Sequence, residues 1–348
     1  MTKRVLVTGA CGFVGSHVVQ YFLTNTDWDI VSLDRLDFSG NLNRLNETVS
    51  EFPKAEQKRV KVVYHDLKAE ITDLTSNFIG HVDVILHLAA ASHVDRSITH
   101  PMEFVLDNTV GTVNLLNYAR KIPNLERIIN FSTDEIFGPA PIGVSYKERD
   151  RYNSTNAYSA SKAAANEFCV AFRNCYKLPV YITQTMNIFG LRQHPEKFIP
   201  MTIRKVRDDE MNIIHSDPSK TFSGSRHYIH ASDVADALWF LLNMTDEQKQ
   251  FVELPDYGGA TCPKFNIVGK EYSNLEMAQM IASVQNKELK YEFVDNHSKR
   301  PGHDTRYSLD GSYMKSLGWE PKVSTEERIK EVTEWSLAHP EWINITDE

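Results

Sequence analysis

Short, uninterrupted apolar runs recur along the first half of the chain, and amphipathic stretches separate them. The first run covers residues 4–8 and ends at a glycine, as expected for a strand that is buried on both faces of a parallel sheet. Apolar positions at helical spacing follow over residues 13–23. Later runs of the same strand-like character cover residues 30–33, 60–64, 82–88, 127–131 and 180–185.

Helical patterns lie between the later runs, over residues 108–120 and 158–176. Such alternation predicts an α/β protein with a Rossmann-like, doubly wound parallel sheet covered on both faces. Beyond about Leu191 the alternation stops, and loops containing Pro, Gly and Ser separate helical patterns at 232–242 and 274–284. We therefore expect a smaller, mostly C-terminal substrate-binding lobe over the carboxyl ends of the strands, where open α/β sheets bind ligands.

A glycine-rich loop joins the first strand to the first helix, with the sequence T-G-A-C-G-F-V-G at residues 8–15. Its early glycines permit a tight turn and the close approach of a pyrophosphate, which would meet the unpaired N–H groups of the helix N-terminus. The spacing differs from the usual G-x-G-x-x-G, so a purely structural turn is the alternative. The strand before it, the helix after it and an acidic residue about twenty positions later favour a dinucleotide site. The residues expected at the cofactor are Gly9, Gly12, Phe13, Val14 and Gly15.

Two acidic residues end the second and third strands. A carboxylate at Asp34 can bind the ribose 2′-hydroxyl and repel a 2′-phosphate, which favours NAD over NADP. Arg35 follows directly and could instead pair with a phosphate. Asp66 is placed to meet the adenine amino group, although a strand-end cap is an equal alternative. On this basis we predict that residues 1–190, with 227–260 returning to them, form the NAD-binding domain, and that 191–226 and 261–348 form the smaller lobe.

A phenol and an ammonium, Tyr158 and Lys162, are four residues apart and so share one helix face. The ammonium should lower the pKa of Tyr158, which could then take a proton from a substrate alcohol. Y-x-x-x-K is common and often structural, and adjacent carboxylates such as Asp134 and Glu135 are ordinarily a solvated loop. Together, after Thr133 at a strand end, these residues favour catalysis.

Composition limits the possible partners and compartments. A net charge of −8 argues against a general nucleic-acid binder, because phosphate backbones are held by clustered Lys and Arg. No apolar stretch has the length of a membrane span, and the N-terminal run is too short for a signal peptide. We expect a cytoplasmic protein that uses no metal. The four cysteines show neither metal-ligand nor disulfide-framework spacing; they are Cys11, Cys169, Cys175 and Cys262.

The ordered set of motifs resembles the extended short-chain dehydrogenase/reductases. It comprises the glycine loop, Asp34, Asp66-Leu67, H-L-A-A at 87–90, Ser132-Thr133 and Tyr158-x-x-x-Lys162. Within that group, four runs resemble the dTDP-glucose 4,6-dehydratase family: S-H-V-D-R-S at 92–97, S-T-D-E-I-F-G at 132–138, P-E-K-F-I-P at 195–200 and R-P-G-H-D-T-R-Y at 300–307. The resemblance extends over essentially the whole chain.

This resemblance implies a redox-neutral cycle on a nucleotide-activated glucose. Tyr158 would deprotonate the sugar 4-hydroxyl, Thr133 would hydrogen-bond that oxygen, and hydride would pass from C4 to NAD. Glu135 would then remove the C5 proton while Asp134 protonates the departing 6-hydroxyl. Hydride returning to C6 would give a 4-keto-6-deoxy sugar nucleotide.

The resemblance also implies binding residues. Those expected at NAD are Asp34, Arg35, Asp66, Leu67, Leu88, Ala89, Ala90, Ser92, Tyr158 and Lys162, in addition to the glycine loop. Those expected at the nucleotide sugar are Ser92, His93, Thr133, Asn187, Glu196, Lys197, Arg226, Asn266, Arg300 and His303. Arg226, Arg300 and His303 would meet the diphosphate, for which the planar arginine fork is suited.

Four features depart from the family pattern. Ala91 stands where Glu is usual, Asp107 where Thr is usual and Ile188 where Asn is usual. The segment 216–225 is longer than the usual loop near the nucleotide base, so the choice between dTDP-glucose and UDP-glucose stays open.

Other functions are less favoured. The nearest alternative is a nucleotide-sugar 4-epimerase or decarboxylase, and the Asp134-Glu135 pair argues against it, because an epimerase does not expel a 6-hydroxyl. A non-catalytic dinucleotide-binding regulator would have no reason to keep Tyr158, Lys162 and both carboxyls.

A homodimer is expected around the helices at 108–120 and 158–176. A helix that is apolar on more than one side needs more than one cover, and the alternative cover is the C-terminal lobe. The residues that the second helix presents away from its catalytic side are Ala164, Phe168, Ala171, Phe172 and Cys175.

Overall fold

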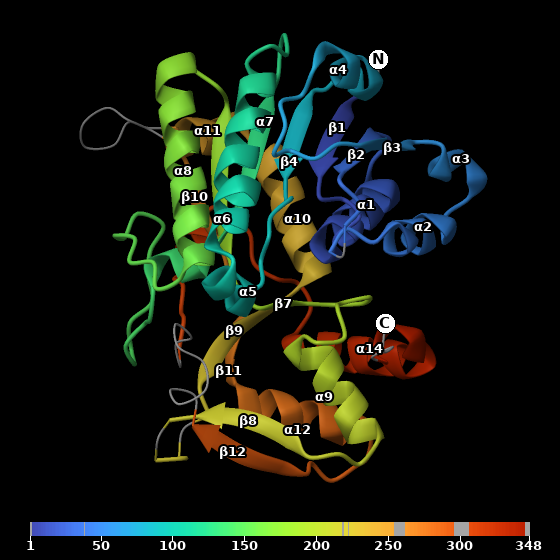
Figure 1. Cartoon of the computed structure of the whole chain (residues 1–348), viewed down its shortest axis with the longest axis vertical. Coiled ribbons are helices and arrows are strands. Elements are labelled where there is room, and N and C mark those ends of the chain that lie inside the picture. Colours follow the sequence, from blue (N-terminus) through green and yellow to red (C-terminus); the bar gives the residue numbers. More distant parts are fainter. Residues whose placement is uncertain are drawn as a thin grey trace.

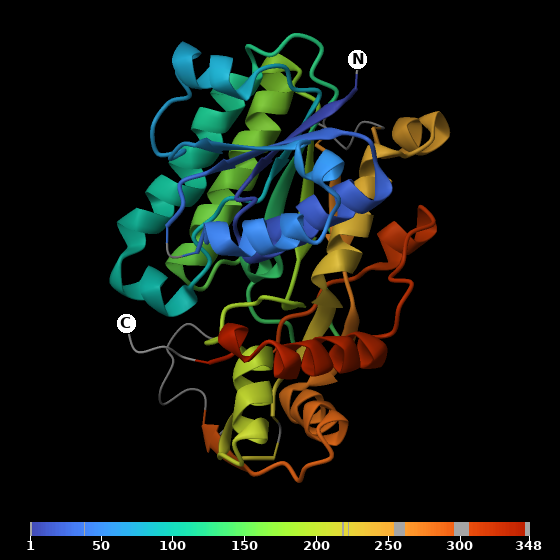
Figure 2. The same cartoon turned by 90° about the vertical axis from the view of Figure 1, so that its right-hand side faces the viewer.

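A computed structural model describes residues 2–37, 39–217, 219–221, 223–253, 262–295 and 306–344 of the chain. A larger lobe contains a seven-stranded, wholly parallel sheet with strand order β10-β6-β5-β4-β1-β2-β3. A smaller lobe lies at the carboxyl ends of these strands (Figures 1 and 2). The strands of the large sheet are β1 (Arg4–Thr8), β2 (Asp29–Asp34), β3 (Val60–Tyr64), β4 (Val84–His87), β5 (Arg127–Thr133), β6 (Val180–Thr185) and β10 (Lys264–Ile267).

Helices cover both faces of the large sheet, which explains its uninterrupted apolar strands. In β1, Val5 and Val7 enter one apolar cluster with α1 and α10, whereas Leu6 enters the opposite cluster with α7 and α8. All three side chains are fully buried, because successive residues of a strand point to opposite faces. The helices around this sheet are α1 (Phe13–Asn25), α2 (Leu42–Ser50), α3 (Lys54–Gln57), α4 (Asp73–Ile79), α5 (Val94–Thr99), α6 (Pro101–Phe104), α7 (Gly111–Ala119), α8 (Ala157–Tyr176), α10 (Ala231–Leu242), α11 (Asp246–Val252) and α13 (Ser312–Ser316).

The smaller lobe combines short strands with three packed helices. Strand β9 pairs antiparallel with β11 and parallel with β7, and β8 pairs with β12. Its core includes Phe189, Ile203, Met277 and Ile329. Its elements are β7 (Ile188–Phe189), α9 (Phe198–Arg207), β8 (Asn212–Ser216), β9 (Ser225–His230), β11 (Lys270–Ser273), α12 (Asn274–Val284), β12 (Tyr291–Asp295), α14 (Thr325–Ala338) and the short turn η3 (Pro340–Trp342).

The predicted fold class and the six predicted strands are confirmed, but one domain boundary is wrong. Strand β10 pairs with β6 at the edge of the large sheet, although residues 261–348 were expected in the smaller lobe. Its Phe265 and Ile267 enter the same apolar cluster as α1. Met314 of α13 also belongs to that cluster, so this C-terminal segment returns to the large lobe because its apolar side chains complete that core. The rest of the division stays a prediction.

Two expectations about helices also change. The expected helix at 108–120 begins earlier, as a π-helical turn η1 (Val105–Val110) that continues into α7. Phe172 of α8 was expected on an outward face, but it is buried beside Leu115 and Leu116 of α7. The neighbouring helix α7 packs against α8, so Phe172 belongs to the chain's own core.

Within the part of the chain that the structure describes, no helix is both long and apolar enough to cross a membrane. Across these same residues, no group of His, Cys, Asp and Glu is arranged to hold a metal ion.

Candidate active site

The glycine loop has the tight geometry that its sequence predicts. Gly9 has a φ of +72°, and a Cβ there would lie 2.8 Å from the backbone of Ala89. A Cβ at Gly15 would lie 2.1 Å from the carbonyl oxygen of Gly9, so the start of α1 packs directly on the loop. Gly12 is the N-cap of α1 and contributes no capping side chain. The first N–H groups of the helix are therefore suited to a phosphate.

A cavity lies beside this loop, where β1, β2, β3 and β4 end. Nine of the residues expected at the cofactor line it: Gly9, Gly12, Asp34, Arg35, Asp66, Leu67, Leu88, Ala89 and Ala90. Phe13, Val14, Gly15, Ser92, Tyr158 and Lys162 are outside this lining. The sequence reasoning missed other lining residues, although their position just after the ends of β2 and β3 could have indicated them: Asp37, Ser39, Gly40, His65 and Lys68.

Asp34 is buried at the end of β2, and its carboxylate is held by backbone groups. Oδ2 accepts a hydrogen bond from the N–H of Cys11 at 3.0 Å, and Oδ1 accepts from the N–H of Leu36 at 3.0 Å. A Cβ on Gly40 would lie 2.3 Å from Oδ1, so the loop after β2 closes over the carboxylate. Burial raises the pKa of Asp34. Each carboxylate oxygen can accept further bonds, which leaves capacity for a ribose hydroxyl.

Tyr158 and Lys162 lie one turn apart on α8, and both are buried. The ammonium of Lys162 donates to the carbonyl oxygen of Phe131 at 2.6 Å. Burial lowers the pKa of Lys162 to about 8. The expected lowering of the Tyr158 pKa is wrong for this state of the chain: burial, and next the charge of Glu135, raise it, while a hydrogen bond with Thr133 opposes them.

The two carboxyl groups that follow β5 have different surroundings. They begin the short 3-10 helix η2 (Asp134–Phe137), which Thr133 caps. Asp134 is buried and accepts a hydrogen bond from Thr133 Oγ1 at 3.1 Å. Burial, and next the negative charge of Glu135, raise the pKa of Asp134 to about 7, although Arg226 acts in the opposite direction. Glu135 is half-buried and accepts a hydrogen bond from Asn156 at 3.2 Å. One group is thus prepared to hold a proton close to neutral pH.

Three of the expected substrate residues, His93, Glu196 and Lys197, lie close to one another. His93 caps α5, and burial followed by the charge of Lys197 lowers its pKa, while Glu196 opposes this effect. The structure therefore brings Glu196 and Lys197, at the start of α9, close to His93. Ser92 and Asn187 are exposed, and Asn187 has a φ of +31°, a backbone region that asparagine tolerates better than most residues.

Arg226 on β9 is the expected diphosphate ligand that the structure describes. Its guanidinium lies 4.9 Å from the ring centre of Tyr307 and donates to the carbonyl oxygen of Ser225 at 2.8 Å. Its charge lowers the pKa of Asp134, so Arg226 lies near that carboxyl group. Arg300 and His303 lie outside the described residues.

The placement of Asn266 contradicts its expected contact with the sugar nucleotide. Its side chain is fully buried in β10, and its amide donates to the carbonyl oxygens of Tyr146 and Asp310, each at 3.0 Å. Its backbone N–H donates to Glu148 at 3.2 Å. These bonds fasten loops to the sheet edge, so Asn266 has a structural role.

The three substituted positions have distinct surroundings. The backbone of Ala91 exchanges two hydrogen bonds with the amide of Asn108, at 2.8 and 3.0 Å. Asp107 forms a bidentate pair with Arg35 at 2.6 and 3.0 Å. Ile188 is half-buried in β7 and pairs with Ile229. Ala91 and Asp107 also line the cavity beside the glycine loop.

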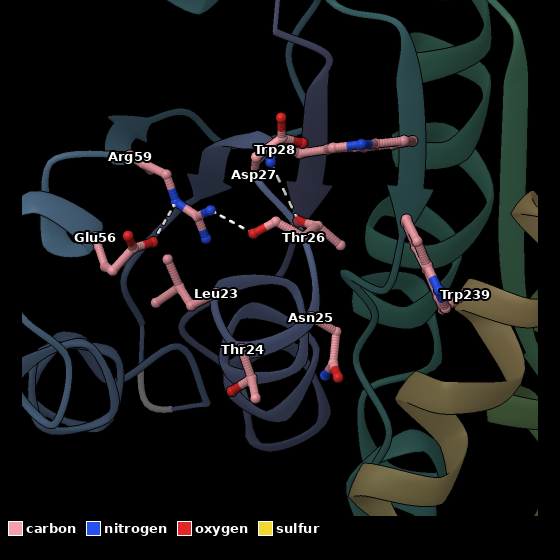
Figure 3. Close-up of a pocket in the computed structure, with 9 residues that line it drawn as sticks. All are labelled: Leu23, Thr24, Asn25, Thr26, Asp27, Trp28, Glu56, Arg59 and Trp239. Carbon is pink, nitrogen blue, oxygen red and sulfur yellow. Dashed lines mark hydrogen bonds and ion pairs between the residues drawn. The ribbon is translucent and has the colours of Figure 1, made fainter.

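A second, open pocket lies around the C-terminal end of α1, and Trp28 and Trp239 are among its lining residues (Figure 3). Arg59 crosses it, pairing with Glu56 at 3.0 Å. None of the predicted site residues lines it, so we do not assign it to the active site.

Known proteins are similar to this chain over nearly all of its residues. The family model described as GDP-mannose 4,6 dehydratase matches residues 6–332. The low-salt glycan biosynthesis protein Agl12 of Haloferax volcanii is 35% identical, covering 97% of this chain and 99% of its own. The dTDP-glucose 4,6-dehydratase of Salmonella typhimurium is 32% identical, with 98% of this chain and 94% of its own covered. A trifunctional UDP-glucose 4,6-dehydratase of Arabidopsis thaliana is 33% identical over 98% of this chain and 48% of its own.

Solved structures agree with these relatives. The dTDP-glucose 4,6-dehydratase DesIV of Streptomyces venezuelae, with NAD and TDP bound, superposes with a TM-score of 0.81. It is 30% identical, and the match covers 97% of this chain and 98% of its own. The UDP-glucose 4-epimerase of Thermus thermophilus, at 24% identity and a TM-score of 0.79 over 95% of this chain and 98% of its own, shares the fold.

Proposed function

The chain belongs to the GDP-mannose 4,6 dehydratase family of nucleotide-sugar 4,6-dehydratases, and from this premise we propose that it converts a nucleoside-diphosphate glucose to its 4-keto-6-deoxy derivative. It is a hydro-lyase. The observation that carries the proposed reaction is the cluster at the end of β5. There Thr133, Asp134 and Glu135 lie close to the buried Tyr158, and the buried Lys162 follows one helical turn later.

The nucleotide-binding domain fits NAD. The glycine loop has the close backbone packing that lets a pyrophosphate approach the N-terminus of α1. The adjoining cavity carries Asp34 where the ribose hydroxyls of an adenosine would lie. NAD, when bound, supplies an acceptor for the C4 hydride and a donor for its return to C6.

In the first step Tyr158 accepts the proton of the 4-hydroxyl while Thr133 hydrogen-bonds the same oxygen. Burial and Glu135 hold the pKa of Tyr158 high, so the phenol needs a positive charge beside it to act as a base. Lys162, one helical turn away, is the residue of this chain suited to supply it.

In the second step Glu135 removes the C5 proton, and Asp134 gives a proton to the departing 6-hydroxyl. The raised pKa of Asp134, about 7, leaves a large fraction of this group protonated near neutral pH, as an acid requires. Neighbouring groups whose environments separate their roles are the usual basis for acid–base assignment. A 4-epimerase needs no acid at C6, so this pair favours dehydration.

For the sugar nucleotide, we propose dTDP-glucose in preference to UDP-glucose. Of the residues that the structure describes, we propose that Arg226, His93, Glu196 and Lys197 bind it. Support comes from the thymidine nucleotide bound to DesIV. The uridine alternative has its own support, because the Arabidopsis relative is named for UDP-glucose.

The test is parallel incubation of the purified protein with dTDP-glucose and with UDP-glucose, followed by mass spectrometry. We expect loss of one water from dTDP-glucose at the higher kcat/KM. Conversion of UDP-glucose alone would reverse the assignment of the base, and loss of water from neither would contradict the proposed substrate.

We also propose a homodimer in the cytoplasm. Helix α8 contacts α6 and η1, and large apolar side chains are exposed over these elements: Met102 is 64% exposed, Leu106 40% and Phe168 41%. Such an apolar surface is typical of an interface between protein chains.

A further inference from the structure

The ion pair between Arg35 and Asp107 crosses the cavity that we assign to the adenosine half of NAD. Arg35 follows the end of β2, whereas Asp107 belongs to η1, and both line the cavity. Nη1 of Arg35 donates to Oδ1 of Asp107 at 2.6 Å, and Nη2 donates to Oδ2 at 3.0 Å. Parallel bonds of this kind fix the plane of the guanidinium as well as its charge.

A third nitrogen of the Arg35 guanidinium also donates a hydrogen bond. Its Nε donates to Asp37 at 2.5 Å. Asp107 in turn pairs with Lys68 at 3.2 Å. A single carboxylate therefore engages both cations that line the cavity, Arg35 and Lys68.

Asp107 is held in place by the residue that follows it. The side chain of Asn108 accepts from the N–H of Ala91 at 2.8 Å and donates to its carbonyl oxygen at 3.0 Å. Asn108 is buried and also donates to Ser161 of α8 at 2.9 Å. The carboxylate of Asp107, whose side chain is only 9% exposed, is thus presented to Arg35 from an anchored turn.

An arginine just after the second strand is the group that ordinarily receives the 2′-phosphate of NADP. We propose that Asp107 is a determinant of cofactor specificity in this chain: it occupies Arg35 and Lys68, so that neither cation is available to a 2′-phosphate. The proposal rests on the NAD site of the proposed function. Asp34 repels the same phosphate, so Asp107 acts as a second, independent barrier.

The experiment measures how much NADP is needed to displace half of the isotopically labelled NAD bound to the protein, without any sugar nucleotide. In Asp107→Thr and Asp107→Asn, NADP should displace NAD at concentrations about tenfold to a hundredfold lower, the equivalent of one charge-assisted hydrogen bond. The affinity for NAD itself should change little. Two variants are used so that the measurement can still be made if one of them does not fold.

A double-mutant cycle identifies which residue provides the gain in affinity for NADP. We expect Arg35→Ala combined with Asp107→Thr to lose most of the increase, because Arg35 would provide the new phosphate contact. Asp66→Asn removes the same charge from the cavity wall and a longer pair with Arg35, at 3.9 Å, but it leaves the bidentate Arg35–Asp107 pair, so it should give a much smaller increase in NADP affinity. The proposal is overturned if neither Asp107 variant gains affinity for NADP, or if the gain persists in full without both Arg35 and Lys68.

Failure of the unchanged protein to bind labelled NAD would overturn the cofactor assignment and this proposal together. Inactivity toward both dTDP-glucose and UDP-glucose would contradict the proposed substrate, but it would not change the concentration of NADP that displaces NAD.

Discussion

The side-chain amide of Asn156 joins Glu135 to the helix that carries Tyr158. Its nitrogen donates to Oε2 of Glu135 at 3.2 Å, and its oxygen accepts from the N–H of Ser159 at 2.8 Å, in the first turn of α8. Asn156 is thereby both the N-cap of α8 and a positioning residue for Glu135.

Replacing Asn156 separates these two roles. Asn156→Ser keeps a capping oxygen but removes the amide that reaches Glu135, so stability should hold while kcat falls about tenfold to a hundredfold. Asn156→Ala should lose the same activity and, in addition, about 1 kcal/mol of stability. Solvent deuterium exchange at C5 is the direct readout. An unchanged exchange rate in Asn156→Ser would show that Glu135 is positioned without this amide.

Isotopic labelling should follow the hydride and the C5 proton. Deuterium placed at C4 of the substrate should appear at C6 of the product, and C5 should gain one deuteron from heavy water.

Glu135→Gln and Asp134→Asn should stop product formation but permit oxidation at C4, which is measured as the reduced dinucleotide released when the protein is denatured. Tyr158→Phe should suppress that oxidation. Each loss should reach about 10²–10⁴-fold. Return of the label to C4 with inversion would identify an epimerase.

The pH dependence should report Asp134. Its pKa of about 7 means that kcat/KM falls as the pH rises through 7, because the departing hydroxyl needs the protonated form. In Asp134→Asn the residual activity should lack this limb.

The protonation of Asp134 also determines how the stability of the fold changes with pH. The folded pKa of Asp134 lies above its ordinary value of 3.8, so its contribution is fully present below pH 3.8 and is lost as the pH rises through about 7. The Tm of Asp134→Asn, relative to the unchanged protein, should therefore rise across this window. A constant difference in Tm would show that Asp134 titrates normally.

Removal of Arg226 should affect binding and the acid together. Because the diphosphate is bound equally in the ground and transition states, Arg226→Ala should raise KM roughly tenfold to a hundredfold with little change in kcat. Arg226 also lowers the pKa of Asp134, so the alkaline limb of the pH profile should move upward. An unaltered KM would place the diphosphate elsewhere.

The proposed dimer should depend on Phe168, which is 41% exposed on α8. Phe168→Glu should shift the protein to monomer in light scattering without lowering its Tm greatly. Phe172→Glu is the contrasting variant: this ring is buried in the chain's own core, so its replacement should destabilise the fold itself. A monomeric unchanged protein at micromolar concentration would refute the dimer.

The sequence predicted most of the sheet because strands buried on both faces are continuous apolar runs, as in residues 4–8 and 180–185. Strand β10 was missed because Lys264 and Asn266 alternate with Phe265 and Ile267. The two polar side chains bond the hydroxyl of Tyr152 and the backbone oxygens of loop residues instead of packing on apolar helices. Local periodicity cannot show that a later segment completes an earlier sheet.

The grouping of the proposed catalytic residues could be expected because Thr133, Asp134 and Glu135 are adjacent, and Tyr158 and Lys162 share one helix face. The direction of the Tyr158 pKa could not, since it depends on burial and on a carboxylate that approaches from another element. The Arg35–Asp107 pair joins residues that are 72 positions apart, and Asp107 could be noticed in the sequence only as an unusual residue near the cofactor.

The late position of β10 has a consequence for synthesis on the ribosome. Strand β6 is made long before its partner, and the intervening chain includes α9, β8 and β9 of the smaller lobe. Until residue 267 has emerged, the nascent nucleotide-binding sheet presents β6 as an unpaired edge, which is the kind of surface that invites misassembly. The nucleotide-binding sheet is consequently completed only after much of the smaller lobe has been made, and a ribosome that stalls before residue 264 would hold a chain whose β6 edge lacks this partner.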